Sequence, residues 1–141
     1  MKIFYQIFSV AILVALLVGC CNCRAVRKNQ LPIIGTEWQL VQLGEESMQP
    51  QEDRFTIQFL AEENRFAGVG DGNRLTATYV LNEKQHTVRL ENAGMTRMMT
   101  PNQELEDRFV AMLGKVTAYD MDGTMLMLFA DKELLAVFQA K

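Results

Sequence analysis

The chain has few of the side chains on which most catalytic sites depend. It contains one histidine, His86, and two serines, Ser9 and Ser47, and no cysteine follows Cys23. A serine–histidine–carboxylate arrangement therefore has almost no residues from which to form, and no other nucleophile is supported by its neighbours. The sequence predicts a protein that is not an enzyme and that has no cofactor.

Positive charge is also scarce. The 141 residues include 14 Lys and Arg against 17 Asp and Glu, which gives a net charge of −3. Nucleic acid is excluded as a partner, because its binding requires a basic surface. A structural zinc site is disfavoured as well, because it needs four ligands, whereas Cys21 and Cys23 offer two thiolates and His86 is the only histidine.

The N-terminus carries a long apolar run instead. Lys2 precedes an uncharged stretch from Ile3 to Gly19, which is the pattern of a secretory signal. The alternative is a retained membrane helix, although 17 residues lie at the lower limit for crossing a bilayer. The letters LVGC at 17–20 resemble the lipobox of bacterial lipoproteins, whose cysteine receives acyl chains such as palmitate. The resemblance implies that residues 1–19 are a lipoprotein signal peptide and that Cys20 is the lipid attachment site.

A lipid on Cys20 would anchor the protein to a membrane of the cell envelope. Position 21 is not the aspartate that often retains lipoproteins at the inner membrane, which favours the outer membrane. Residues 20–34 are expected to form a lipidated tether, and residues 35–141 the folded domain. Cys21 and Cys23 either stay free or pair with strained geometry. The basic residues of the tether either contact anionic head groups or are solvated.

The domain shows the alternation of half-buried strands. Phe55–Phe59, Arg74–Leu81 and Thr87–Glu91 place apolar residues at every second position. Asp122-Gly123 favours a hairpin turn, because both residues tolerate positive φ. About eight short strands are expected.

One segment has helical spacing. Residues 101–113 place apolar side chains at intervals of three and four, with Gly114 at the end. Thr100 is expected to cap the helix, Pro101 to occupy its first position, and Gln103 to complete a capping box. The fold class is therefore α+β: a mostly antiparallel, curved or partly open barrel-like sheet with one helix.

Four stretches together resemble the META domain, also called the heat-shock protein HslJ-like domain. They are Trp38-Gln39-Leu40, the RFAGVGDGNRLTATY segment, the MTRMMTP segment, and Glu106 with Phe109. The resemblance covers about residues 35–138 and implies an exported domain linked with stress and antibiotic tolerance, with no catalytic residues to carry over. Family members usually have cysteine where this chain has Gly72 and Thr100. If those positions approach each other, a cross-link has been lost as a unit.

Two glycine-containing segments are interpreted as turns. GVGDGNR at 68–74 leads into a strand, whereas a dinucleotide fingerprint must open a helix. Asp120-Met121-Asp122-Gly123 lacks the later glutamate of a calcium loop.

Methionine is the most unusual residue class. Seven methionines fall between positions 95 and 127. They suit an adaptable core, an adaptable groove or, least well, a Cu(I) site. The candidate groove is assigned to Met98, Met112 and Met127.

The sequence leaves three hypotheses for function. The first is a non-enzymatic envelope lipoprotein that supports envelope integrity or stress tolerance by binding a partner, such as another envelope protein. The second is a carrier of a lipid or other hydrophobic ligand, which requires one apolar cavity beside Met98, Met112 and Met127. The third is an enzyme, which requires a cleft that brings Arg97 together with buried carboxylates.

Overall fold

The structure is a computed structural model that describes residues 30–141. The predicted signal peptide, Cys20 and the tether up to residue 29 lie outside the described residues. Within the described part, no helix combines the length and the apolar character needed to cross a membrane.

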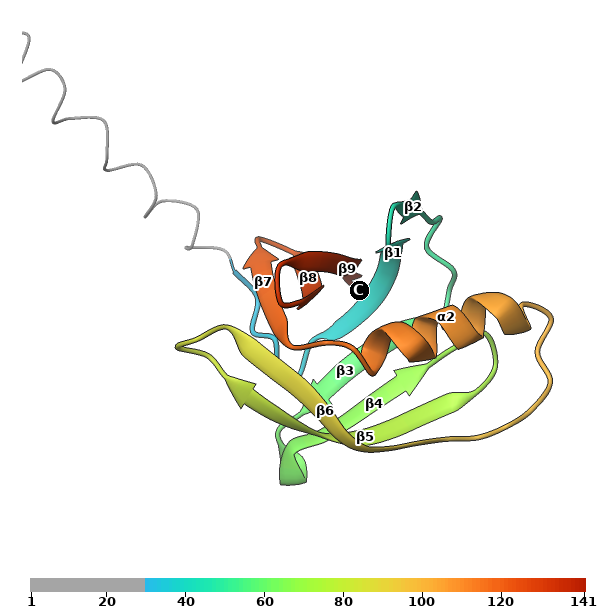
Figure 1. The fold of residues 1–141 in the computed structure, drawn as a ribbon, viewed down its shortest axis with the longest axis horizontal. Coiled ribbons are helices and arrows are strands. Elements are labelled where there is room, and N and C mark those ends of the chain that lie inside the picture. The colour runs from blue at the N-terminus through green and yellow to red at the C-terminus, as the bar shows by residue number, and fades with distance from the viewer. Residues whose placement is uncertain (1–29) are drawn as a thin grey trace, which may run out of the picture.

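Nine antiparallel strands form one curved sheet (Figure 1). Their bounds are β1 Glu37–Leu43, β2 Glu46–Ser47, β3 Thr56–Leu60, β4 Arg65–Val69, β5 Arg74–Asn82, β6 Thr87–Met95, β7 Ala118–Asp122, β8 Met125–Ala130 and β9 Glu133–Ala140. The strands follow chain order except that β2 lies outside β1, and β1 also pairs with β9. This second pairing bends the sheet into a ring, as the α+β prediction of a barrel-like sheet required. The expected eight strands are all present, and the two-residue β2 is the ninth.

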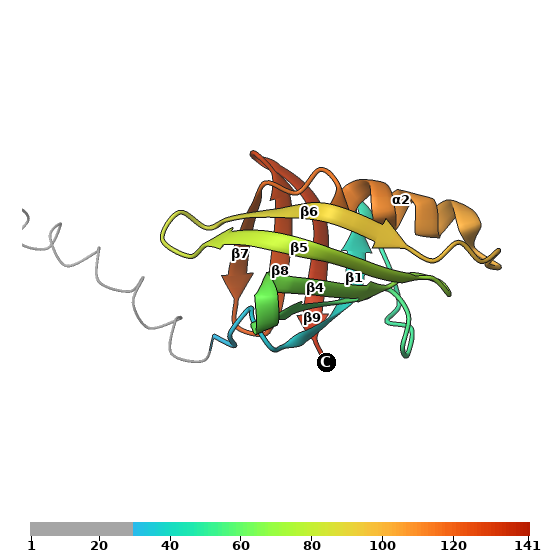
Figure 2. The same cartoon turned by 90° about the horizontal axis from the view of Figure 1, so that it is seen from below.

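The ring is not a regular barrel. β6 pairs with β5 along its whole length, but it meets β7 at a single register pair, Thr87 with Ala118. The two strands diverge beyond that point, as the view from below in Figure 2 shows.

Alternate side chains of the strands fill the interior of the ring. Trp38 and Leu40 of β1, Leu126 of β8 and Phe138 of β9 are all essentially inaccessible to solvent. The folded part also extends beyond β1 toward the N-terminus, because Ile33 is buried and its carbonyl accepts a hydrogen bond from Trp38 Nε1 at 3.2 Å.

The predicted hairpin between β7 and β8 forms, with its loop one residue later than expected. In the β7–β8 hairpin, Asp122 pairs with Met125, so that Gly123 and Thr124 form the loop. Gly123 has φ +58°, whereas Asp122 stays in the strand. Only one of the two expected residues therefore adopts positive φ.

The helix α2 runs from Gln103 to Leu113 and ends at Gly114. It packs beside the ring through Phe109, whose ring centroid lies 5.5 Å from that of Phe55 in an edge-to-face contact (Figure 1). A short 3-10 turn, η3 Glu62–Asn64, is the other helical element in the described residues.

The predicted capping box is wrong. The N-cap residue is Asn102, and no side chain caps the helix from that position. Gln103 instead donates from Nε2 to Asp107 Oδ1 at 2.9 Å, and the Thr100 hydroxyl donates to Glu106 Oε2 at 3.3 Å. The Thr100 hydroxyl therefore bonds to the buried Glu106 carboxylate and does not provide the helix cap that its position in the sequence predicts.

Candidate functional site

The three methionines of the predicted groove lie in different environments. Met112 is in the core with 5 % of its surface exposed, whereas Met98 is 58 % exposed on the loop before α2. Met127 is half-buried on β8, between the core residues Leu126 and Leu128 and on the opposite face of the strand. The cavity that Met98 lines has neither Met112 nor Met127 in its wall.

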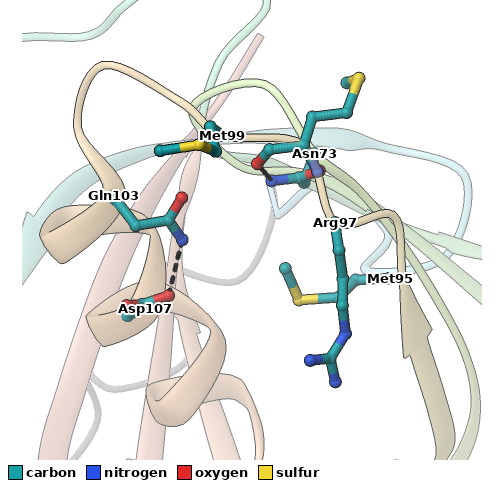
Figure 3. Close-up of a pocket in the computed structure, with 7 residues that line it drawn as sticks. Asn73, Met95, Arg97, Met99, Gln103 and Asp107 are labelled. Carbon is teal, nitrogen blue, oxygen red and sulfur yellow. Dashed lines mark hydrogen bonds between the residues drawn. The ribbon is translucent and has the colours of Figure 1, made fainter.

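That cavity lies between the loop before α2 and the first turns of the helix. Its volume is about 380 Å³, and it is open to solvent. The lining side chains are Asn73, Met95, Arg97, Met98, Met99, Gln103 and Asp107. Figure 3 shows Met95 and Arg97 on one wall, Gln103 and Asp107 on the other, and Met99 above them.

The loop that carries these methionines is fixed from beneath by Asn73. The Asn73 side chain donates from Nδ2 to the carbonyl of Met98 at 2.9 Å and accepts at Oδ1 from the Met98 backbone N–H at 2.7 Å. The hydroxyl of Thr96 donates to the same Oδ1 at 2.9 Å. Asn73 is fully buried in the turn between β4 and β5. It therefore holds the loop through backbone atoms and leaves the Met98 side chain free.

Glu106 supports Asn73 from the helix. Its carboxylate is fully buried and accepts from Asn73 Nδ2 at 2.7 Å and from the Asn73 backbone N–H at 3.0 Å. The Gly72 N–H and the Thr100 hydroxyl, each at 3.3 Å, complete four donors. A Cβ at Gly70 would collide with Glu106 Oε1, so the close approach of this carboxylate requires glycine there.

These contacts decide the charge of Glu106. Burial alone would raise the pKa of its carboxyl group, but the hydrogen bonds from Asn73, Gly72 and Thr100 outweigh burial and lower the pKa below its ordinary value. Glu106 is therefore an anion held by neutral donors.

Asp71 caps the helix from outside it. One carboxylate oxygen, Oδ2, accepts the backbone N–H of Asn102 at 2.9 Å, and the other accepts from Arg54 at 3.0 Å. The negative charge lies at the N-terminus of α2, where the helix dipole favours an anion. The turn between β4 and β5 thus provides hydrogen-bond partners both for the N-terminus of α2, through Asp71, and for the loop before it, through Asn73.

Arg97 has no ion-pair partner among residues 30–141. It is exposed and faces the cavity, whose wall contains Asp107 but neither Glu106 nor Asp71. The buried carboxylates are satisfied in the network beneath the loop and do not share a cleft with Arg97. Residues 30–141 also contain no group of three or more His, Cys, Asp and Glu side chains arranged to hold a metal ion.

Positions 72 and 100 do approach each other. A Cβ built on Gly72 would lie 3.9 Å from the Cβ of Thr100, inside the range seen across disulfides. The two positions at which the resemblance implies cysteine are therefore in contact with each other, as expected if both cysteines of one disulfide have been replaced together.

Sequence reasoning missed two features of this site. The sequence does not predict Met95, Met99, Gln103 and Asp107 as cavity residues, because Met95 ends β6, Met99 lies in the loop before α2, and the other two lie on the exposed side of the helix. Glu106 and the segment that contains Asn73 carry the family resemblance, but the sequence predicts no role for either residue. A buried glutamate on the apolar side of α2, three residues before Phe109, is the signal that could have found them.

Comparison with family models matches the META domain to residues 30–141. The chain belongs to the META domain family. This META domain has no match among curated proteins.

Solved structures share the fold of this META domain. A DUF4847 family protein from Bacteroides vulgatus has a TM-score of 0.56 at 19% identity, over 76% of this chain and 93% of that one. A protein from Burkholderia xenovorans has a TM-score of 0.60 at 20% identity, over 77% of this chain and 83% of that one. At these identities the similarity shows the fold alone.

Proposed function

We propose that this chain is a non-enzymatic lipoprotein of the cell envelope, anchored through Cys20, whose META domain supports envelope integrity or stress tolerance by binding a partner protein. The observation that carries the proposal is the exposed surface formed around one cavity by Met98, Met99 and Arg97, which has no ion-pair partner among the described residues. We call this set the methionine–arginine surface.

Two adjacent exposed methionines favour a protein partner. Met99 is 99 % exposed and Met98 is 58 % exposed, whereas most large apolar side chains of the described domain are buried. Methionine is flexible and polarizable, so it can fit an apolar side chain of a partner without a preformed complementary shape. The loop backbone beneath is already fixed by Asn73 and Glu106, which lowers the entropy lost on binding.

Arg97 indicates what else the partner carries. Its guanidinium group offers a planar set of donors for which residues 30–141 provide no carboxylate. We expect the partner segment to place an apolar side chain among the methionines and an Asp or Glu against Arg97. The mixed cavity wall, with Gln103 and Asp107 opposite, suits such a segment better than an acyl chain. This disfavours the carrier hypothesis, which required one apolar cavity shared by Met98, Met112 and Met127.

Site-specific photo-crosslinking tests the partner. A photoreactive residue is placed at position 99 of the full chain in the living envelope, with position 80 as the control, because Val80 is 49 % exposed on β5 and lies outside the cavity. We expect one adduct from position 99, mapped to an apolar segment next to a carboxylate and lost in Arg97→Glu. Equal adducts from positions 99 and 80, or an adduct indifferent to Arg97→Glu, would contradict the proposal.

The anchor is tested separately. Cys20→Ala should abolish lipid labelling and release the protein from the membrane fraction, with Cys23→Ala as the matched control. Unchanged fractionation of Cys20→Ala would refute the lipid anchor without bearing on the methionine–arginine surface.

A further inference from the structure

The methionine–arginine surface exposes sulfur more than any other described part of the chain. Met99 is almost completely accessible, Met98 is more than half accessible, and Met95 lines the same cavity. Met112, on the same helix-and-loop unit, has 5 % of its surface exposed. Oxidants that react with a thioether therefore meet the sulfur atoms of Met98 and Met99 first.

We propose that Met98 and Met99 are modification sites, at which a peroxide or a hypohalous acid converts the thioether to methionine sulfoxide. With hydrogen peroxide, a sulfur lone pair attacks one peroxide oxygen, the O–O bond breaks and an S–O bond forms. The sulfur is oxidised by two electrons, the peroxide is reduced by two, and the second oxygen leaves as water after proton transfer. Methionine sulfoxide reductases reverse the change.

The fold tolerates this modification. Asn73 holds the loop through the backbone N–H and carbonyl of Met98, at 2.7 and 2.9 Å, so the loop does not depend on the Met98 side chain. Glu106 and Thr100 complete the network without either exposed thioether. Oxidation of Met98 and Met99 therefore changes the surface and leaves the core intact.

Oxidation changes the polarity of the methionine–arginine surface. A sulfoxide is polar and adds a strong hydrogen-bond acceptor, whereas the thioether is apolar. Arg97, which has no ion-pair partner among residues 30–141, lines the same cavity as Met98 and Met99. A sulfoxide within reach of Arg97 competes with a partner carboxylate for the guanidinium group. This consequence rests on the proposed function, because it concerns the affinity for the partner.

Peptide mass spectrometry of the full-length protein, after a short treatment with dilute hydrogen peroxide, tests the modification site. We expect Met98 and Met99 to form sulfoxide at least about tenfold faster than Met112, which is the internal control. The midpoint of thermal unfolding should not change, and the double variant Met98→Leu/Met99→Leu should lose the fast phase of oxygen uptake. Comparable rates at Met112, or a lower unfolding midpoint when only Met98 and Met99 are oxidised, would overturn the proposal.

A second arm tests the effect on binding. A photoreactive residue at Gln103 should form the partner adduct before peroxide treatment, lose most of it afterwards, and regain it after treatment with methionine sulfoxide reductases. An adduct that survives sulfoxide formation overturns the switching effect. If no adduct forms before oxidation, the proposed function fails, while the mass-spectrometric rates still decide whether the modification site exists.

Discussion

A buried carboxylate is costly unless its oxygens find donors, and Glu106 meets that condition with four of them. The donors come from the turn between β4 and β5 and from the loop before α2, so a single side chain joins three segments. Glu106 holds the Asn73 side chain, and Asn73 in turn accepts a hydrogen bond from the backbone N–H of Met98.

Replacement of Glu106 by glutamine tests this role. The amide keeps the shape but turns an N–H group toward donors that need an acceptor. Glu106→Gln should lower the free energy of unfolding by about 3 kcal/mol, because hydrogen bonds to a buried charge are lost and a donor is left unsatisfied. Chemical denaturation measures the change. The control is Glu104→Gln, on the exposed side of the same turn, which should change stability by less than about 0.5 kcal/mol; equal effects of the two substitutions would contradict the assigned role.

The charge of Glu106 also predicts a pH dependence. Because the folded pKa is below its ordinary value of 4.5, the ionised form stabilises the fold fully above that pH, and this contribution is lost as the pH falls toward the folded pKa. The stability difference between the wild type and Glu106→Gln should therefore be constant well above pH 4.5 and shrink as the pH falls below that value toward the folded pKa. Urea unfolding at several pH values checks this. A difference that stays constant or grows on acidification would mean that the folded pKa is not lowered.

At the scale of elements, α2 begins with a cap that its own sequence does not contain. Asp71 supplies the acceptor for the Asn102 N–H from the β4–β5 turn, and the Gln103 side chain donates to Asp107. The local sequence pattern predicts the extent of the helix almost correctly, but it predicts the wrong cap. The N–H group at the start of the helix, that of Asn102, donates to Asp71 of a distant turn and not to a residue of the helix.

Two substitutions separate these accounts of the helix start. Gln103→Ala should cost less than about 0.5 kcal/mol, the value of an exposed pair four residues apart. Asp71→Asn should cost about 2 kcal/mol, because Asp71 is buried and serves both Arg54 and the helix end. Thermal and urea unfolding measure both. A larger cost for Gln103→Ala than for Asp71→Asn would restore the capping box.

The contact between Gly72 and Thr100 predicts an engineered cross-link. Gly72→Cys/Thr100→Cys should form a disulfide, since the Cβ atoms would be 3.9 Å apart and Gly72 does not have positive φ. Closing the intervening chain should stabilise the oxidised form by about 3 kcal/mol on the chain-entropy model. Peptide mapping identifies the bond, and unfolding with and without reductant measures its effect. Failure to form the bond, or an oxidised form no more stable than the reduced one, would contradict this geometry.

The strands show how far pattern reasoning extends. Runs with clear alternation, such as Arg74–Leu81, form strands, here β5, because one face of the strand is mostly polar. The run at Phe55–Phe59 also forms a strand, β3, but Phe55 lies outside it with positive φ. β8 reads MLMLFA and is apolar on both faces, so the sequence could not tell that Leu126 and Leu128 point inward while Met127 points away. An alternating pattern predicts which side chains point inward only when one face of the strand is polar.

At the scale of the whole molecule, the ring is closed by pairing of β1 with β9, and β6 and β7 diverge after one register pair. Such long-range geometry depends on the packing of α2 and on strand twist, and neither has a local signature. The general α+β architecture followed from the order of the strands and helix. The candidate site could not be predicted in this way, because the cavity depends on which distant segments of the chain pack against each other.

We propose that a partner binds through Arg97 and the exposed methionines. The most direct measurement is the affinity of the purified full-length protein for the partner segment mapped by crosslinking at position 99. Arg97→Glu should weaken binding at least about tenfold, since it replaces attraction for a partner carboxylate by repulsion. Arg65→Glu makes the same charge change on β4, outside the cavity, and should leave the affinity within about twofold. If Arg97→Glu binds as tightly as Arg65→Glu, the methionine–arginine surface is not where the partner binds.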